Sequence, residues 1–167
     1  MKSVLAPADL VADPDSVAAR VDVAAFERLT QALVDITTHS LDALGESPVT
    51  VAQFRLLHAL DGLGRVPSST LAAALGTAAS SVTRLVDRLE AIGLVARGAA
   101  EHSRSIVTVE ATEAGREVVL AVLARRRELL ATVLDGLAEA ERGEAAATAE
   151  RLARLAGQVA PTSRSAW

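Results

Sequence analysis

Between residues 68 and 95 the apolar positions follow a helical period twice, with a glycine between the two runs. In the first run, Leu71, Ala74 and Leu75 stand at i, i+3 and i+4, so they share one face of a helix. Gly76 follows directly, at a point where helices often end in a left-handed residue that glycine adopts without steric cost. We therefore expect a short helix that ends in a turn.

The second run predicts another helix with one apolar and one polar face, ended by Gly93. The apolar stripe consists of Val82, Leu85, Val86, Leu89 and Ile92. The polar face consists of Ser80, Ser81, Arg84, Asp87 and Arg88. Two helices joined by a glycine turn, with hydroxyls and arginine at the exposed start of the second, are typical of a helix-turn-helix, whose second helix enters the DNA major groove. For such a match by itself, an ordinary helical hairpin is the alternative.

Hydroxyl side chains stand where helix N-caps are expected, because their oxygens accept hydrogen bonds from the first backbone amides. Ser68 or Ser69 is the predicted cap of the first helix, and Thr77 of the second. Thr112 is the predicted cap of a later, longer helix.

Two runs after the helix-turn-helix predict a β-hairpin: residues 94–97 and 104–111, joined by a loop at 98–103. The second run alternates and is rich in β-branched residues, with Val107, Val109 and Ala111 on one face and Thr108 and Glu110 on the other. A helix-turn-helix followed by a hairpin is a winged helix. Its wing carries Arg104, which can reach a phosphate or a narrow minor groove, and Arg97 is expected to serve the wing with it.

Longer amphipathic helices flank this segment. Residues 22–44 carry apolar side chains at mostly helical spacing, with Asp22 as the candidate cap. Thr50 and Gln53 form a capping box for the next helix, and residues 61–67 are predicted to be a loop.

After residue 112, two helices, the second at about 139–158, carry more apolar residues than one small lobe can cover. We expect these helices, together with the first, to pack across a two-fold dimer, although a monomer whose helices cover one another is the alternative.

At this point the sequence resembles the MarR family of transcriptional regulators. The matching words are SSVTRLVDRLEAIGLVAR at 80–97, VEATEAGR at 109–116 and TVAQF at 50–54, together with Arg104 in the wing. The resemblance implies a fold that is mainly α with a small β-wing. The family usually has an aspartate two residues before the wing arginine; here His102 stands there beside Glu101, and whether either replaces it is left open.

The resemblance also divides the chain. It covers residues 22–160 as a single MarR-like domain, with a winged helix-turn-helix lobe at 49–112 and a helical dimerisation lobe made of 22–46 and 113–160. Residues 1–21 are expected to be a partly ordered N-terminal extension, and residues 161–167 a C-terminal tail.

The implied function is sequence-specific DNA binding by a homodimer that acts as a ligand-responsive repressor on a pseudo-palindromic operator. Two recognition helices roughly 34 Å apart would match successive major grooves. No enzymatic activity, cofactor or metal is expected. The candidate DNA-contacting residues are Ser80, Ser81, Thr83, Arg84, Arg88, Arg97 and Arg104.

The resemblance also implies a small aromatic or anionic effector, held between the dimerisation helices and the winged helix-turn-helix lobe. His39, Phe54, Arg55 and His58 are the candidates that line such a cleft. The alternative is that Phe54 is a core residue and that both histidines are surface or capped residues.

Composition and charge narrow these alternatives. The 167 residues are 50% apolar and include no cysteine, which excludes disulfides and thiolate metal sites. No apolar run approaches the roughly 20 residues that a membrane span needs, so we expect a cytoplasmic protein. The net charge of −4 arises before residue 66, because residues 66–112 carry four basic and four acidic side chains and residues 113–167 carry eight of each. The run Arg125-Arg126-Arg127 is expected to be a solvated face rather than a phosphate contact.

Two other classes of function stay open. A winged helix used for protein contact would also have a neutral lobe. A metal-dependent sensor or enzyme is a weaker alternative, because His39, His58 and His102 are far apart and show no His-Glu-x-x-His spacing, and no nucleophile stands beside a base.

Overall fold

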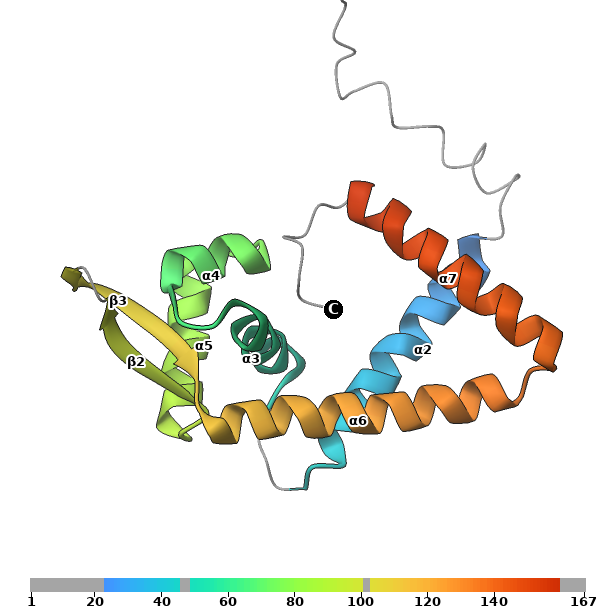
Figure 1. Ribbon diagram of the computed structural model, residues 1–167, viewed down its shortest axis with the longest axis horizontal. Helices are drawn as coiled ribbons and strands as arrows, with labels where there is room; N and C mark the ends of the chain where they lie inside the picture. Colours follow the sequence, from blue (N-terminus) through green and yellow to red (C-terminus); the bar gives the residue numbers. More distant parts are fainter. Residues whose placement is uncertain (1–22, 46–48, 101–102, 160–167) are drawn as a thin grey trace, which may run out of the picture. The chain divides into compact units, whose positions relative to one another are not determined.

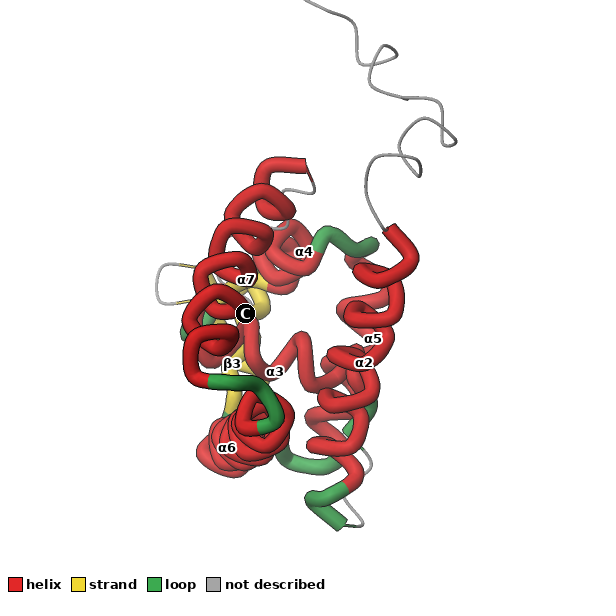
Figure 2. Tube along the Cα trace, turned by 90° about the vertical axis from the view of Figure 1, so that its right-hand side faces the viewer, coloured by secondary structure: helices red, strands yellow, loops and turns green. Residues whose placement is uncertain are grey.

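Helices make up most of the chain, and one small sheet accompanies them (Figures 1 and 2). A computed structural model describes residues 23–45, 49–100 and 103–159. The chain divides into two units, residues 1–35 and 36–167, and each is considered by itself. The described residues form six helices and a three-stranded antiparallel sheet, the mainly α architecture with a β-wing that the sequence predicts.

Three helices form the centre of the second unit: α3 (Val51–Leu63), α4 (Ser68–Leu75) and α5 (Ala79–Ala91). The predicted capping box begins α3, because the Gln53 amide donates to Thr50 Oγ1 at 3.3 Å and the Thr50 amide donates to Gln53 Oε1 at 2.8 Å. The predicted turn follows α4, where Gly76 takes a left-handed conformation with φ 61°.

Two predicted caps are wrong. Helix α4 starts at Ser68 itself, so its N-cap is Pro67 and neither Ser68 nor Ser69 precedes the helix. Thr77 lies too early to cap α5, because its amide still donates to Ala72 of the preceding helix at 3.1 Å. The N-cap of α5 is Ala78, without a side-chain hydrogen bond.

The sheet consists of β1 (Val66–Pro67), β2 (Val95–Ala100) and β3 (Ser103–Ala111), in the order β1-β3-β2. The predicted loop at 61–67 is therefore wrong at both ends, since α3 continues to Leu63 and Val66 pairs with Val109. The hairpin strands are also longer than predicted, because β2 and β3 pair from Val95–Ala111 to Ala100–Ser103. His102 and Glu101 lie outside the described residues.

Only part of the β3 face that carries Val107, Val109 and Ala111 is buried. Val109 and Ala111 lie in the core, but Val107 is 52% exposed. Val107 pairs with Ala99 farther out along the hairpin, whose strands project beyond the helices in Figure 1. Thr108 points to the other face and is nevertheless buried; its hydroxyl donates to the Gly98 carbonyl at 3.1 Å.

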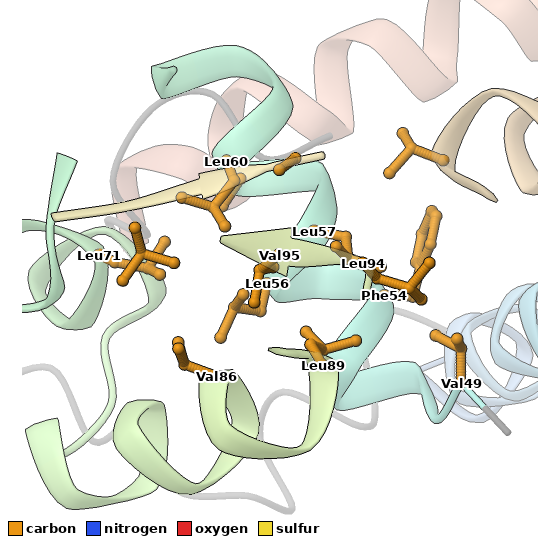
Figure 3. Close-up of a cluster of buried hydrophobic side chains, with 14 of the residues drawn as sticks. Val49, Phe54, Leu56, Leu57, Leu60, Leu71, Val86, Leu89, Leu94 and Val95 are labelled. Atoms are coloured by element: carbon orange, nitrogen blue, oxygen red, sulfur yellow. The ribbon is translucent and has the colours of Figure 1, made fainter. Parts of the chain in front are cut away.

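The core of the second unit joins α3, α4, α5, the sheet and the first turns of α6 (Glu113–Asp135), and Figure 3 shows part of this cluster. Aliphatic side chains fill it almost alone, as the scarcity of aromatics in the sequence requires. Its fully buried larger members are Phe54, Leu56, Leu57, Leu60, Leu71, Leu89, Val82, Val86, Val109, Val119 and Val122.

Helix α6 begins where the hairpin ends (Figure 1). As predicted, Thr112 is its N-cap; the Thr112 hydroxyl accepts from the Gly115 amide at 3.1 Å and donates to the Gly93 carbonyl at 2.7 Å. The Thr112 amide donates to the Leu94 carbonyl at 3.1 Å. A Cβ placed on Gly115 would lie 2.1 Å from that same carbonyl oxygen, so the start of α6 lies directly against the segment that follows α5.

The flanking helices α2 (Val23–Asp42), α6 and α7 (Glu139–Val159) agree with the predicted long helices to within a few residues. Asp22, the predicted cap of α2, lies outside the described residues. Each of the three helices keeps large apolar side chains exposed in the single chain. They include Phe26, Leu29, Leu33 and Val34 of α2, Leu120, Val133 and Leu134 of α6, and Leu152 and Leu155 of α7.

Candidate nucleic-acid interface

The second helix of the helix-turn-helix, α5, has one buried and one exposed face, as its sequence predicts. Val82, Val86 and Leu89 are fully buried and fix the helix on the core. Two members of the predicted apolar stripe are less covered, because Leu85 is half-buried and Ile92 is exposed. The opposite, exposed face carries Ser80, Thr83, Arg84, Asp87 and Arg88, with Ser81 half-buried beside them.

The first turns of α5 hold most of the predicted contact residues. Thr83 donates its hydroxyl proton to the Ala79 carbonyl at 3.0 Å, which leaves its oxygen able to accept a hydrogen bond. Arg84 and Arg88 lie one turn apart on the exposed face. A helix start carries partial positive charge, so the hydroxyls, Arg84 and the helix dipole together favour an anionic partner there. Arg88 adds a positive charge in the last turn of the helix.

Arg97, predicted to serve the wing, is engaged by carboxylates of the same unit. Its side chain extends from β2 to α5 and forms ion pairs with Asp87 and Glu90. The hydrogen bond with Asp87 is the main cause that raises the pKa of Arg97 above its usual value. Sequence spacing did not indicate this network, because the three residues belong to two elements.

A second ion pair, which the sequence analysis did not foresee, joins Arg65 to Glu110 of β3. The hydrogen bond from Arg65 lowers the pKa of the Glu110 carboxyl. The two residues are 45 positions apart, and only the pairing of β1 with β3 brings them together. Arg104, the predicted wing-tip contact, belongs to β3, and its side chain lies outside the described part.

The predicted effector residues lie on two helices. Phe54 of α3 is 1% exposed, and its ring stacks on that of His58 with centroids 5.9 Å apart and planes at 17°. Arg55 is half-buried on the same helix, whereas His39 lies exposed near the end of α2. Burial chiefly lowers the pKa of His58, and Nδ1 of its ring is buried without a hydrogen-bond partner among the described residues.

Arg126 of α6 corrects the prediction of a fully solvated arginine run. It is half-buried, and its charge helps to lower the pKa of His58. Arg126 follows the buried Val122 by four positions, so it lies on the side of α6 that faces the lobe. Arg125, one position earlier, is exposed and pairs with Glu128 at 2.9 Å. The spacing of four residues from the apolar Val122 was the sequence signal that could have predicted the partial burial of Arg126.

The described ranges contain no group of three His, Asp or Glu side chains that could hold a metal ion. Within the same ranges, none of the helices is long and apolar enough to span a membrane.

Comparison with known proteins identifies relatives of this chain that include the winged helix-turn-helix lobe. A model of the MarR family matches residues 47–105. The HTH-type transcriptional repressor MdtR of Bacillus subtilis (strain 168) is 31% identical over 121 residues, which cover 72% of this chain and 78% of that protein.

Solved structures are similar over most of their length. The crystal structure of RV1404 from Mycobacterium tuberculosis has a TM-score of 0.75 and 33% identity, and the match covers 82% of this chain and 94% of that one. FabT of Streptococcus pneumoniae, solved in complex with DNA, has a TM-score of 0.64 over 81% of this chain and 99% of its own. At 18% identity, this last likeness is one of fold.

Proposed function

Because this chain belongs to the MarR family of transcriptional regulators, we propose that it binds DNA as a homodimeric, ligand-responsive repressor of a pseudo-palindromic operator. The observation that carries the proposal is the polar face of α5, which stays exposed while Val82, Val86 and Leu89 fix the helix on the core. MdtR, similar over most of this chain, is itself a repressor by name, which supports the same direction of regulation.

The proposed reading residues are the ones that the fold leaves accessible on α5 and the one carried by the wing. Arginine can bind guanine in the major groove through two hydrogen bonds, while hydroxyl groups contact either bases or phosphates. The proposed contacts are Ser80, Ser81, Thr83, Arg84 and Arg88 on α5, and Arg104 on β3.

Homodimerisation is proposed to cover the exposed apolar side chains of α2, α6 and α7. Leu120 of α6, for example, is 62% exposed in the single chain. Surfaces of this kind on three helices favour association with a second copy, and two-fold symmetry would present two α5 helices to one duplex. Sedimentation of the protein at micromolar concentration tests this part, and a monomer would contradict it.

The proposed effector site involves His58, Phe54, Arg55 and His39. We add Arg126 to this proposed set, because its charge acts on His58. A half-buried guanidinium whose charge acts on a histidine with an unsatisfied ring nitrogen favours an anion. Phe54 itself is 1% exposed and belongs to the core, so the aromatic character of the effector is what the family resemblance implies. An effector of this class would regulate the protein by binding the DNA-competent and the DNA-incompetent states with different affinities.

The decisive experiment is selection of bound duplexes from a random DNA pool, followed by gel shift with the selected duplex and with DNA upstream of the coding region. Arg84→Ala is expected to weaken binding to the selected duplex by about 1–3 kcal/mol if Arg84 reads a base. Arg151→Ala, which removes one positive charge from exposed α7, is the matched control and should retain the parent's preference.

Arg104→Ala tests the wing separately. Loss of one phosphate contact should lower the slope of log affinity against log salt by about 0.9. An unchanged slope would contradict a phosphate contact by Arg104, whereas failure to select any duplex would reject DNA binding altogether and favour a winged helix that contacts protein.

A further inference from the structure

Two carboxylates lie next to the surface of α5 that is proposed to meet DNA. Thr83, Asp87 and Glu90 follow one another at i, i+4 and i+7, so they form one stripe along the helix. Ser80, Arg84 and Arg88 recur every four residues and form the neighbouring stripe. Unpaired, two negative charges at this place would repel the phosphates of a bound duplex.

One guanidinium group of the wing pairs with both carboxylates. Arg97 lies opposite Val109 in the β2–β3 ladder, and directly opposed residues share a face of a sheet. Since Val109 is fully buried, Arg97 leaves β2 on the side of the helices. Its Nη2 binds Asp87 Oδ1 and its Nη1 binds Glu90 Oε2. Among the three side chains Arg97 is the least exposed, at 29% against 56% and 40%.

In this geometry two of the five N–H donors of the Arg97 guanidinium group are bound to carboxylates of α5. Each of its two terminal nitrogens is directed to a carboxylate on the recognition helix, and the planar fork of arginine suits such a bridge, whereas a lysine ammonium would act as a single point charge. The other strand of the hairpin has its own attachment, the Arg65–Glu110 ion pair. The network of Arg97 therefore attaches β2 to the exposed side of α5.

We infer that Arg97 is a positioning residue: it fixes the base of the wing on the recognition helix and offsets the charge of Asp87 and Glu90, instead of contacting DNA itself. The inference rests on the proposed DNA-binding function. It assigns Arg97 a different role from Arg84 and Arg104, although the sequence pattern predicts all three arginines to be DNA contacts.

The test is a set of variants measured for binding to the selected duplex, at a temperature where circular dichroism shows each of them folded. Arg97→Gln is made in the parent and in an Asp87→Asn/Glu90→Gln background. Both acidic side chains are exposed, and the amides keep their shape, so this background should fold. Arg84→Gln in the same background serves as the control for a residue that contacts DNA.

In the parent, Arg97→Gln is expected to weaken binding about tenfold or more, because it leaves two carboxylates unpaired and loosens β2. In the background without carboxylates, the same change should alter affinity less than about threefold and leave the salt slope unchanged, whereas Arg84→Gln should still lower both. A phosphate contact by Arg97 would instead lower the slope by about 0.9 in that background, and this result would overturn the inference.

A measurement without DNA separates this inference from the proposed function. Hydrogen exchange of β2 amides should accelerate in Arg97→Gln and in Asp87→Asn/Glu90→Gln to a similar degree, while the β1–β3 pairing keeps its protection. Unchanged exchange in β2 would overturn the positioning role. A parent protein that selects no duplex but shows the expected exchange would reject DNA binding and leave the attachment of the wing intact.

Discussion

Gly115 offers the sharpest test of how the lobe is assembled. The Gly115→Ala change adds one methyl group, and the added carbon would lie 2.1 Å from the Leu94 carbonyl oxygen, 3.2 Å from the Leu94 carbonyl carbon and 3.3 Å from Leu57 Cδ2. Side-chain carbons do not approach backbone oxygen within 3.0 Å, so the start of α6 must move by roughly 1 Å. The closest atom belongs to backbone, which cannot rotate away as a flexible side chain would.

The expected cost follows from three contributions. Overpacking of this kind costs about 1–3 kcal/mol and sometimes more. The shift also strains the hydrogen bonds from Thr112 to Gly93 and Leu94, each of which stabilises the fold by about 0.5–1.5 kcal/mol. Alanine returns up to about 1 kcal/mol as a better helix former. We therefore expect a net loss of about 2–4 kcal/mol, which corresponds to a melting temperature lower by roughly 5–15 °C.

Urea and thermal unfolding at equal protomer concentration measure this loss. The matched control is Gly143→Ala, because Gly143 lies inside α7 with no atom near its would-be side chain. That change should stabilise the protein by about 0.5–1 kcal/mol through helix propensity alone. If Gly115→Ala is as stable as the parent, or gains stability as the control does, the close contact between α6 and Leu94 is refuted.

Three further changes test other parts of the structure. Burial lowers the pKa of His58 in the folded protein, so near the usual histidine pKa the unfolded state binds more protons, and the free energy of unfolding should fall as the pH decreases from 7.5 to 5.5. His58→Gln should flatten that decrease in urea unfolding, and an equally steep decrease in the variant would argue against the effect. Thr50→Ala should cost about 1 kcal/mol in the same assay by removing the α3 capping box, and a neutral result would show that the cap contributes nothing. Benzoate, as a small aromatic anion, should raise the melting temperature of the parent more than that of Arg126→Gln, and an equal increase would speak against Arg126 as part of the effector site.

Periodicity predicts what repeats over several turns. The apolar stripe of α5 covers more than two helical turns, and the burial of Val82, Val86 and Leu89 is confirmed, whereas Leu85 is half-buried and Ile92 is exposed. The capping box at Thr50 and the turn at Gly76 rest on local chemistry and are also confirmed. These elements could be predicted because the residues that specify them are close together in the chain.

Features that depend on contacts between residues far apart in the chain could not be predicted from the sequence. Strand β1 has only two residues and is therefore too short for any alternation of apolar and polar positions. One of the two is Pro67, and proline is found mainly at sheet edges. The ion pairs of Arg65 and Arg97 form only after the strands have paired. Ser80 and Arg84 could be placed on an exposed face, but which base or phosphate they would contact stays a prediction, since that depends on the partner.

The single unbroken length of α6 has a mechanical consequence. Its first three turns are built into the lobe through Val119 and Val122, while Val133 and Leu134 near its far end are uncovered. At 1.5 Å per residue, its 23 residues form a rod about 35 Å long, so a pivot of only about 5° at one end displaces the other by about 3 Å. Gly115, at the lobe end of α6, packs directly against the backbone of Leu94. Such a pivot would therefore also move the end of α5, which Leu94 follows closely in the chain.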